Sequence, residues 1–289
     1  MFDVIIIGAG PAGISAALYC KRANLNVLVI HKCGGSLLKA ELIENYYGLE
    51  APISGEALLH RGIDQAEKLG IELLEQEVVG VEYNGNFSVK TKFESYETKA
   101  LIMATGTGRL APKIVGISEF EGKGVSYCAM CDAFFYRGKN VAVLGSGEYA
   151  LHEALELKPI VGTVTLVTNG EPTSVELPAD MQVNTNKIKS LSGDITLSHI
   201  NFEDGSSINA DGVFVAYGVA GSSQLARVLG AELDGNRIVV NDKMQTSING
   251  LFACGDCAGG LLQIAKAVHE GAVAGIEAVK AVRSQNIKH

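Results

Sequence analysis

The sequence predicts an α/β protein with two doubly wound domains, the second inserted into the first. Three observations support this prediction. Residues 4–30 and 140–167 each contain a β-branched strand, a glycine turn, a helix and another strand. Residues 246–256 then form a strand that ends in Gly255-Asp256, which together with residues 101–106 returns the chain to the first domain.

The bulk composition limits the possible functions. A chain of 289 residues is long enough for two domains of ordinary size, and its 47% hydrophobic content and 34 glycines indicate a globular, turn-rich protein. A net charge of −8 argues against nucleic acid as the main partner. No apolar run reaches the eighteen residues of a membrane span, and the N-terminus lacks the basic region of a signal peptide. We therefore expect a cytoplasmic protein that is not bound to a membrane.

The first glycine turn has the spacing and the context of a dinucleotide-binding, Rossmann-like motif. Its elements are a strand at 4–7, the turn at 8–13, a helix at 14–23 and a strand at 26–30. Gly8 permits the tight turn, Gly10 lets the main chain approach a pyrophosphate, and Gly13 lets the helix pack against the strand. The usual acidic ribose ligand is missing at His31-Lys32. An incidental glycine turn is the less favoured alternative, because the flanking strands fit the motif.

Two cysteine pairs have the C-x-x-C spacing, Cys128/Cys131 and Cys254/Cys257. Six cysteines are too sparse for a disulfide scaffold, and more than a hundred residues separate the pairs, which disfavours a shared zinc site. Thiols at this spacing can close a small disulfide ring. Asp132, beside the first pair, can donate or accept the proton that thiol–disulfide exchange requires. A buried pair without redox function is the alternative. For Cys254/Cys257 we favour small apolar fillers over a third redox station, and we expect no metal site.

These motifs together resemble the low-molecular-weight thioredoxin reductases over essentially the whole chain. The blocks that carry the resemblance occur in the family's order: 8–13, Gly34-Gly-Ser-Leu37, Asn45, Ala104-Thr-Gly106, Cys128-Ala-Met-Cys131-Asp132-Ala-Phe-Phe-Tyr136 and Gly255-Asp256. The resemblance implies FAD in the first domain and a homodimer. It also implies that Cys131 faces the flavin, that Cys128 attacks the disulfide of thioredoxin, and that Asp132 is the acid/base. The expected FAD-binding residues are Gly8, Gly10, Pro11, Ala12, Gly13, Gly35, Leu37, Asn45, Ala104, Thr105, Gly106, Gly255, Asp256, Gln263 and Ile264.

The second glycine motif, Gly145 to Ala150, departs from the family where the electron donor would bind. NADPH-dependent members carry a His-Arg-Arg-x-x-x-Arg cluster for the 2′-phosphate, whereas the matching stretch, Thr168 to Ser174, has no basic residue. Glu148 lies in the first turn of the following helix, where a carboxylate would repel a pyrophosphate. The Leu177-Pro178 step and the polar stretch after it leave little room for the helix expected next.

The sequence therefore looks like the ferredoxin-dependent flavin thioredoxin reductases, in which reduced ferredoxin is the electron donor. The alternatives are an ordinary NAD(P)H-dependent thioredoxin reductase, with Glu171 as a conceivable ribose ligand for NADH, a flavin-dependent dithiol oxidase and a flavin-binding scaffold. The predicted domains are residues 1–112 with 241–289 for FAD, and 113–240 for the redox pair and the degenerate nucleotide motif.

Overall fold

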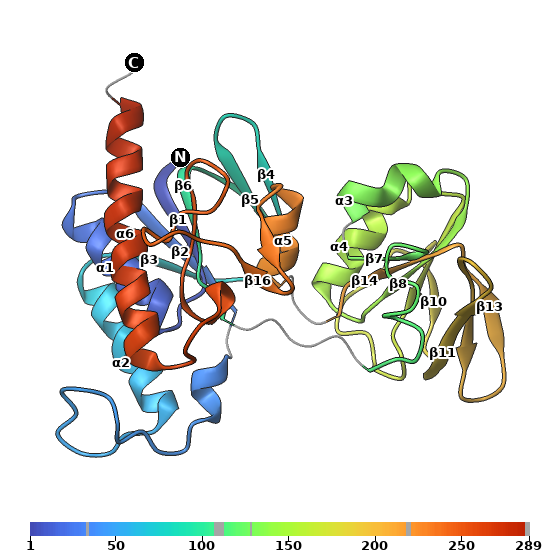
Figure 1. Ribbon diagram of the computed structural model, residues 1–289, viewed down its shortest axis with the longest axis horizontal. Helices are drawn as coiled ribbons and strands as arrows, with labels where there is room; N and C mark the ends of the chain where they lie inside the picture. The colour runs from blue at the N-terminus through green and yellow to red at the C-terminus, as the bar shows by residue number, and fades with distance from the viewer. Residues whose placement is uncertain (33–34, 107–112, 128, 218–220, 287–289) are drawn as a thin grey trace. The chain divides into compact units, whose positions relative to one another are not determined.

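A computed structural model describes residues 1–32, 35–106, 113–127, 129–217 and 221–286, without the side chains of Lys39, Met130, Cys131 and Asn286. The chain forms two compact units, Met1–Gly108 with Gly221–His289, and Arg109–Ala220 (Figure 1). Both units contain a parallel sheet with helices, so the predicted α/β fold is confirmed. Among the described residues, no helix is long and apolar enough to cross a membrane.

The first unit is built on a seven-stranded sheet whose parallel part has the order β3-β2-β1-β6, with β17 also beside β6. The pair β4–β5 continues the sheet in the antiparallel sense. The strands are β1 (Phe2–Ile7), β2 (Val27–His31), β3 (Glu72–Glu75), β4 (Val78–Tyr83), β5 (Phe87–Thr91), β6 (Ser95–Met103) and β17 (Leu251–Ala253). Residues 4–7 of β1 are buried on both faces, as a central parallel strand requires.

Two helices that are distant in sequence cover one face of this sheet. Helix α1 (Pro11–Arg22) runs alongside α6 (Ile264–Asn286), and α2 (Gly55–Lys68) packs beside α1 (Figure 1). The two helices approach closely because α6 carries glycine at the contact: a Cβ at Gly271 would lie 2.1 Å from the carbonyl oxygen of Ala12. The hydroxyl of Ser15 also donates to the carbonyl of Val268 at 2.7 Å. These contacts fix the beginning of α1 against the C-terminal part of the chain.

The second unit has a parallel sheet of order β10-β9-β8-β14-β7 and an antiparallel sheet of order β11-β12-β13. The parallel strands are β7 (Val125–Ser126), β8 (Asn140–Leu144), β9 (Thr163–Val167), β10 (Gln182–Asn184) and β14 (Gly212–Val215). The antiparallel strands are β11 (Ile188–Gly193), β12 (Leu197–Phe202) and β13 (Ser207–Asn209). Its helical elements are α3 (Ala129–Asp132), the 3₁₀ turn η2 (Ala133–Tyr136) and α4 (Glu148–Leu157). The two sheets share one apolar core.

The return crossover differs from the boundary expected near residue 240. Residues 221–240 group with the first unit, because α5 (Ser222–Val228) packs on β4 and the β15 (Leu233–Asp234)–β16 (Arg237–Ile238) hairpin packs on the 3₁₀ turn η3 (Gly255–Ala258). The outward boundary, expected between residues 112 and 113, lies next to residues 107–112, which are outside the described residues.

Candidate functional site

The first glycine turn connects β1 to α1 in a way that only glycine permits. Gly8 has a φ of 113°, and a Cβ there would lie 2.3 Å from the carbonyl oxygen of Ala104. A Cβ at Gly13 would lie 1.8 Å from the carbonyl oxygen of Gly8. A Cβ at Gly10, by contrast, would meet nothing within 4 Å. Gly8 and Gly13 therefore serve packing, whereas Gly10 leaves the main chain open in front of the helix.

The amino end of α1 has the electrostatics of an anion-binding site. Its N-cap residue is Gly10, Pro11 occupies the first turn, and this fully described helix has no acidic residue in its first turn and no side-chain cap. The helix dipole and the first N–H groups there favour a phosphate.

The segments that follow β6 and β17 lie beside this turn, because these two strands are parallel neighbours. Met103 at the end of β6 pairs with Ala253 at the end of β17, so the segments that follow them lie at the same edge of the sheet. The hydroxyl oxygen of Thr105 is buried there without a hydrogen-bond partner. A Cβ at Gly255 would lie 2.9 Å from the Cβ of Ala12, in the first turn of α1. The orphaned hydroxyl and the glycine cradle fit a bound dinucleotide at this edge.

A charged pair on α6 holds the turn that contains Asp256. The carboxylate of Glu270 accepts a 2.8 Å hydrogen bond from the main-chain nitrogen of Gly255, and the ammonium of Lys266 donates a 2.9 Å bond to the carbonyl of the same residue. Lys266 and Glu270 also form a 2.9 Å ion pair, with side chains 15% and 14% exposed. Neither residue was predicted from the sequence, although their i,i+4 spacing just after the Gly-Asp turn was a usable signal.

The remaining predicted residues of the first unit lie in two places. Asn45 donates a 3.4 Å hydrogen bond to the side-chain oxygen of Gln263, next to Ile264 at the start of α6. Gly35, with φ of 116°, precedes the 3₁₀ turn η1 (Ser36–Lys39). Leu37 in that turn packs on the start of α2, where a Cβ at Gly55 would lie 1.8 Å from its carbonyl oxygen. The structure thus brings Asn45 to Gln263 and sets Leu37 against α2.

The redox motif lies on α3 in the second unit. Cys128 lies outside the described residues, and Cys131 is described by its main chain in α3 only. The hydroxyl of Ser126 donates a 2.6 Å hydrogen bond to the carboxylate of Asp132. Glu153, on α4, accepts a 2.8 Å hydrogen bond from the main-chain nitrogen of Ala129, between the two cysteines. Neither Ser126 nor Glu153 was predicted from the sequence; Glu153 reaches α3 only because α4 packs against it, whereas Ser126 lies six residues before Asp132.

Burial makes Glu153 an unusual carboxyl group. Its side chain is largely inside the unit, at 8% exposure, and burial raises its pKa from 4.5 to about 7. The hydrogen bond from Ala129 lowers this pKa, while the charge of Glu156 raises it. Glu153 therefore titrates near neutral pH.

The second glycine turn is retained for packing. A Cβ at Gly145 would lie 2.3 Å from the carbonyl oxygen of Ala216, so glycine is needed for contact between strands whatever binds there. Glu148 lies in the first turn of α4, as predicted. Residues 168–181 contain no helix, and the main-chain nitrogen of Ser174 donates a 3.0 Å hydrogen bond to the carbonyl of Ser146 in the turn.

A lysine beside this loop, Lys187, is paired with a carboxylate. A Cβ added at Gly170 would lie 3.6 Å from the Cβ of Lys187. The ammonium of Lys187 forms a 3.1 Å ion pair with Glu203. The loop therefore contributes no basic side chain of its own, and the lysine beside it has a carboxylate partner.

The second C-x-x-C pair consists of two buried thiols. Cys254 and Cys257 are buried, and the thiol of Cys257 donates to the carbonyls of Met103 and Cys254 at 3.4 and 3.3 Å. Burial raises the pKa of Cys257 to about 11 and that of Cys254 well above its ordinary value, so both are thiols at neutral pH. Among the described residues, no three His, Cys, Asp or Glu side chains could hold a metal ion. The apolar-filler interpretation explains this pair.

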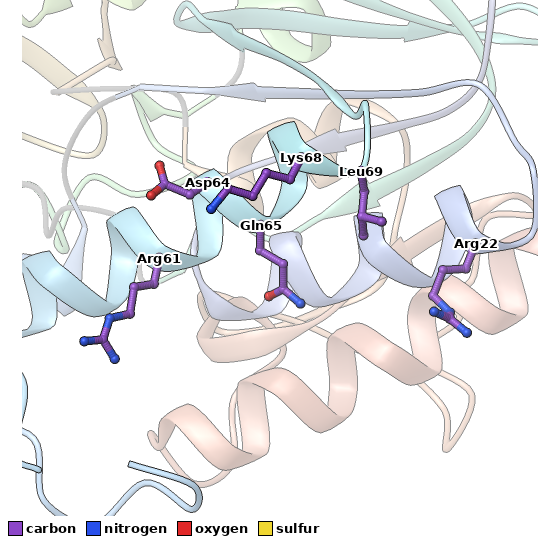
Figure 2. Close-up of a pocket in the computed structure, with 6 residues that line it drawn as sticks. All are labelled: Arg22, Arg61, Asp64, Gln65, Lys68 and Leu69. Atoms are coloured by element: carbon purple, nitrogen blue, oxygen red, sulfur yellow. The ribbon is translucent and has the colours of Figure 1, made fainter. Parts of the chain in front are cut away.

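A pocket on the first unit lies away from the glycine turn. Figure 2 shows it at the carboxyl ends of α1 and α2, lined by Arg22, Arg61, Asp64, Gln65, Lys68 and Leu69. A twelve-residue helix is about 18 Å long, so Arg22 lies that far from the anion-binding end of α1. Its cations complement the negative ends of the two helix dipoles. This pocket is not the dinucleotide site.

Comparisons with known proteins agree with this arrangement. The family model of pyridine nucleotide-disulphide oxidoreductases matches residues 2–271. The thioredoxin reductase of Bacillus subtilis (strain 168) is 33% identical, over 95% of this chain and 92% of that protein. The crystal structure of the atypical thioredoxin reductase from Desulfovibrio vulgaris Hildenborough is 40% identical with a TM-score of 0.94, covering 98% of this chain and 99% of that one. A ferredoxin-flavin thioredoxin reductase from Clostridium acetobutylicum is 31% identical with a TM-score of 0.75, covering 98% of both chains.

The chain belongs to the pyridine nucleotide-disulphide oxidoreductases and, within them, to the low-molecular-weight thioredoxin reductases. FAD is the cofactor of this class. The open main chain at Gly10, the amino end of α1 and the orphaned hydroxyl of Thr105 fit its pyrophosphate.

Proposed function

We propose that this chain is a thioredoxin reductase whose electron donor is reduced ferredoxin rather than NADPH, and whose redox-active thiols are Cys128 and Cys131. The observation that carries the proposal is the loop after β9, residues 168–174, which has no basic residue. Glu148 adds a carboxylate in the first turn of α4.

The missing charges are large enough to decide between donors. Hydrogen bonds to a charged group contribute about 1.5–3 kcal/mol each, so losing two contacts to a 2′-phosphate costs about 3–6 kcal/mol. Since 1.4 kcal/mol is tenfold in affinity, NADPH binding would weaken by roughly a hundredfold or more. The carboxylate of Glu148 acts in the same direction, because it competes for the positive end of the helix dipole.

The name of one similar protein supports the same proposal. That solved relative is called a ferredoxin-flavin thioredoxin reductase, whereas another is called atypical without naming a donor. The B. subtilis relative is called a thioredoxin reductase without a qualifier, so the family likeness by itself leaves the donor open. The loop after β9 is what favours ferredoxin here.

FAD would be held in the first unit by residues 8–13, 35–37, 104–106, Asn45 and 255–264. This cofactor suits a one-electron donor because it accepts electrons singly and delivers them as a pair.

At the dithiol, the Cys128 thiolate attacks one sulfur of the thioredoxin disulfide and forms a mixed disulfide. Cys131 then attacks Cys128, which closes the Cys128–Cys131 disulfide and releases the second thioredoxin thiolate. Asp132 supplies the proton that the leaving sulfur takes.

An anaerobic titration of the purified holoenzyme tests the donor. We expect reduced ferredoxin to bleach the flavin absorbance rapidly, and millimolar NADPH or NADH to leave it unchanged on the timescale of turnover. Fast bleaching by micromolar NADPH would restore the ordinary NADPH-dependent assignment. Oxygen consumption with small dithiols as sole substrates would instead indicate a dithiol oxidase.

The proposal includes a cytoplasmic homodimer, which rests on the likeness to the family. Light scattering coupled to gel filtration measures the mass directly, and a mass near the 30.4 kDa of one chain would contradict the dimer.

A further inference from the structure

Glu153 is a buried carboxyl group bonded to the main chain of the redox motif. Its Oε2 lies 2.8 Å from the nitrogen of Ala129, which is the peptide nitrogen that joins Ala129 to Cys128. Its neighbours on α4, Ala150, Ala154 and Leu157, are fully buried and apolar. Burying a carboxyl group costs free energy unless its interactions compensate.

The surroundings of Glu153 offer negative rather than positive charge. The other charge that acts on it is that of Glu156, which raises its pKa further. Besides Glu153, the titratable groups on α4 and on the elements packed against it are Glu148, Tyr149, His152 and Glu156 on α4, and Cys131 and Asp132 on α3. Strands β8 and β9, the other neighbours of α4, carry none. The carboxyl group is therefore not held there by a salt bridge within these elements.

We propose that Glu153 is a positioning residue for the dithiol, which fixes the main chain between Cys128 and Cys131 and sets the redox potential of the pair. The inference rests on the proposed redox role of these two cysteines. It adds a residue from α4, more than twenty positions after the motif, to the machinery of thiol–disulfide exchange.

The sign of the effect follows from electrostatics. An ionised Glu153 places a negative charge at the peptide nitrogen of Ala129, the residue bonded to Cys128, and a negative charge disfavours a second one on a nearby sulfur. It therefore destabilises the thiolate forms of the reduced pair. A dithiol whose reduced form is less stable is a stronger reductant, the direction in which a thioredoxin reductase must work. Removing the charge would stabilise the reduced form and make the pair less reducing.

Two substitutions separate the charge from the hydrogen bond. Glu153→Gln removes the charge and keeps a side-chain oxygen that can accept from Ala129, whereas Glu153→Ala removes both. Glu156→Gln is the matched control, because it deletes a carboxylate from the same helix at an exposed position without a bond to α3. The holoenzyme of each is equilibrated anaerobically with dithiothreitol redox buffers at pH 6 and pH 8.5. Alkylation and mass spectrometry of the peptide with Cys128 and Cys131 give the reduced fraction.

For Glu153→Gln at pH 8.5 we expect a three- to tenfold shift of the equilibrium constant toward the reduced pair, where tenfold is about 30 mV. At pH 6, where Glu153 is mostly protonated, the shift should fall below twofold, and Glu156→Gln should stay below twofold at both values. An unchanged equilibrium for Glu153→Gln at pH 8.5 overturns the inference, even if Glu153→Ala is unstable.

A second measurement, turnover with thioredoxin, distinguishes this inference from the function on which it rests. If Cys128→Ser or Cys131→Ser retains full turnover with thioredoxin, the dithiol mechanism itself is wrong. If both are inactive while Glu153→Gln matches the wild type at both pH values, the dithiol mechanism stands and the role of Glu153 alone is wrong. Because the redox buffer equilibrates with the thiols directly, the result for Glu153→Gln does not depend on the identity of the electron donor.

Discussion

The ion pair between Lys266 and Glu270 gives the sharpest test of how the first unit holds its cofactor turn. Glu270 bonds the nitrogen of Gly255, and Lys266 bonds the carbonyls of Gly255 and Gly259. Both side chains are about 15% exposed. Lys266→Met leaves Glu270 without its counter-ion, and Glu270→Gln does the same to Lys266. Each single change should therefore loosen η3, which contains Asp256.

The magnitude follows from the burial of the pair. Breaking a fully buried ion pair by removing one partner costs about 3–5 kcal/mol, and an exposed pair contributes about 0–1 kcal/mol. At 15% exposure we expect each single variant to lose about 2–3 kcal/mol of unfolding free energy. For a domain of this size, that lowers the melting temperature by roughly 4–12 °C.

Urea unfolding of the FAD-free protein and FAD retention after dialysis are the two measurements. The double variant, Lys266→Met with Glu270→Gln, should lose at least about 1 kcal/mol less than the sum of the singles, because it leaves no unpaired charge. Lys280→Met is the control: Lys280 also pairs with a glutamate of α6 but is 64% exposed, so its loss should stay within about 0.5 kcal/mol. The reasoning is refuted if the stability losses of the two single variants add up to that of the double variant. It is also refuted if each single variant loses as little stability as Lys280→Met.

Three further outcomes are expected. Cys131→Ser and Cys128→Ser should both keep FAD and lose disulfide reduction, measured as thioredoxin turnover; full activity in either would contradict the dithiol mechanism. Asp132→Asn should slow turnover by roughly ten- to ten-thousand-fold with little change in melting temperature. Ser126→Ala, which removes the 2.6 Å hydrogen bond to the Asp132 carboxylate, should slow turnover by a smaller factor. If both variants instead melt at lower temperature and turn over at the normal rate, Asp132 is a structural residue. Burial raises the pKa of Glu153 from 4.5 to about 7, so the folded state binds its proton more tightly than the unfolded state. The protein should therefore lose up to about 3 kcal/mol of stability as the pH rises from 4.5 to 7. Urea unfolding of Glu153→Gln, which cannot titrate, should lack this part of the decline, and an identical pH profile would show that Glu153 titrates normally.

Local patterns were enough to predict most of the fold. Parallel strands of a buried sheet are short β-branched runs, which is why residues 4–7, buried on both faces, and 163–167, buried at three of five positions, could be placed from the sequence. The glycine turns were equally readable, because positive φ and close main-chain contacts leave no other residue type at Gly8. The segment 221–240 was placed in the wrong unit, since its short elements carry no motif and only their packing on β4 and η3 assigns them.

The sequence by itself determined the class of the protein, the C-x-x-C spacing of Cys128 and Cys131, and the absence of basic residues after β9, because each depends on residue types at fixed spacing along the chain. Only the tertiary structure decided which side chains support those motifs. Glu153 reaches Ala129 across 24 positions, and Gln263 reaches Asn45 across 218. Such contacts arise where helices and strands pack, and a side chain that serves as their anchor looks in the sequence like any other polar residue on a helix face. Burial likewise gives Glu153 a pKa near neutrality and keeps Cys257 a thiol, since both effects depend on desolvation by residues far away along the chain.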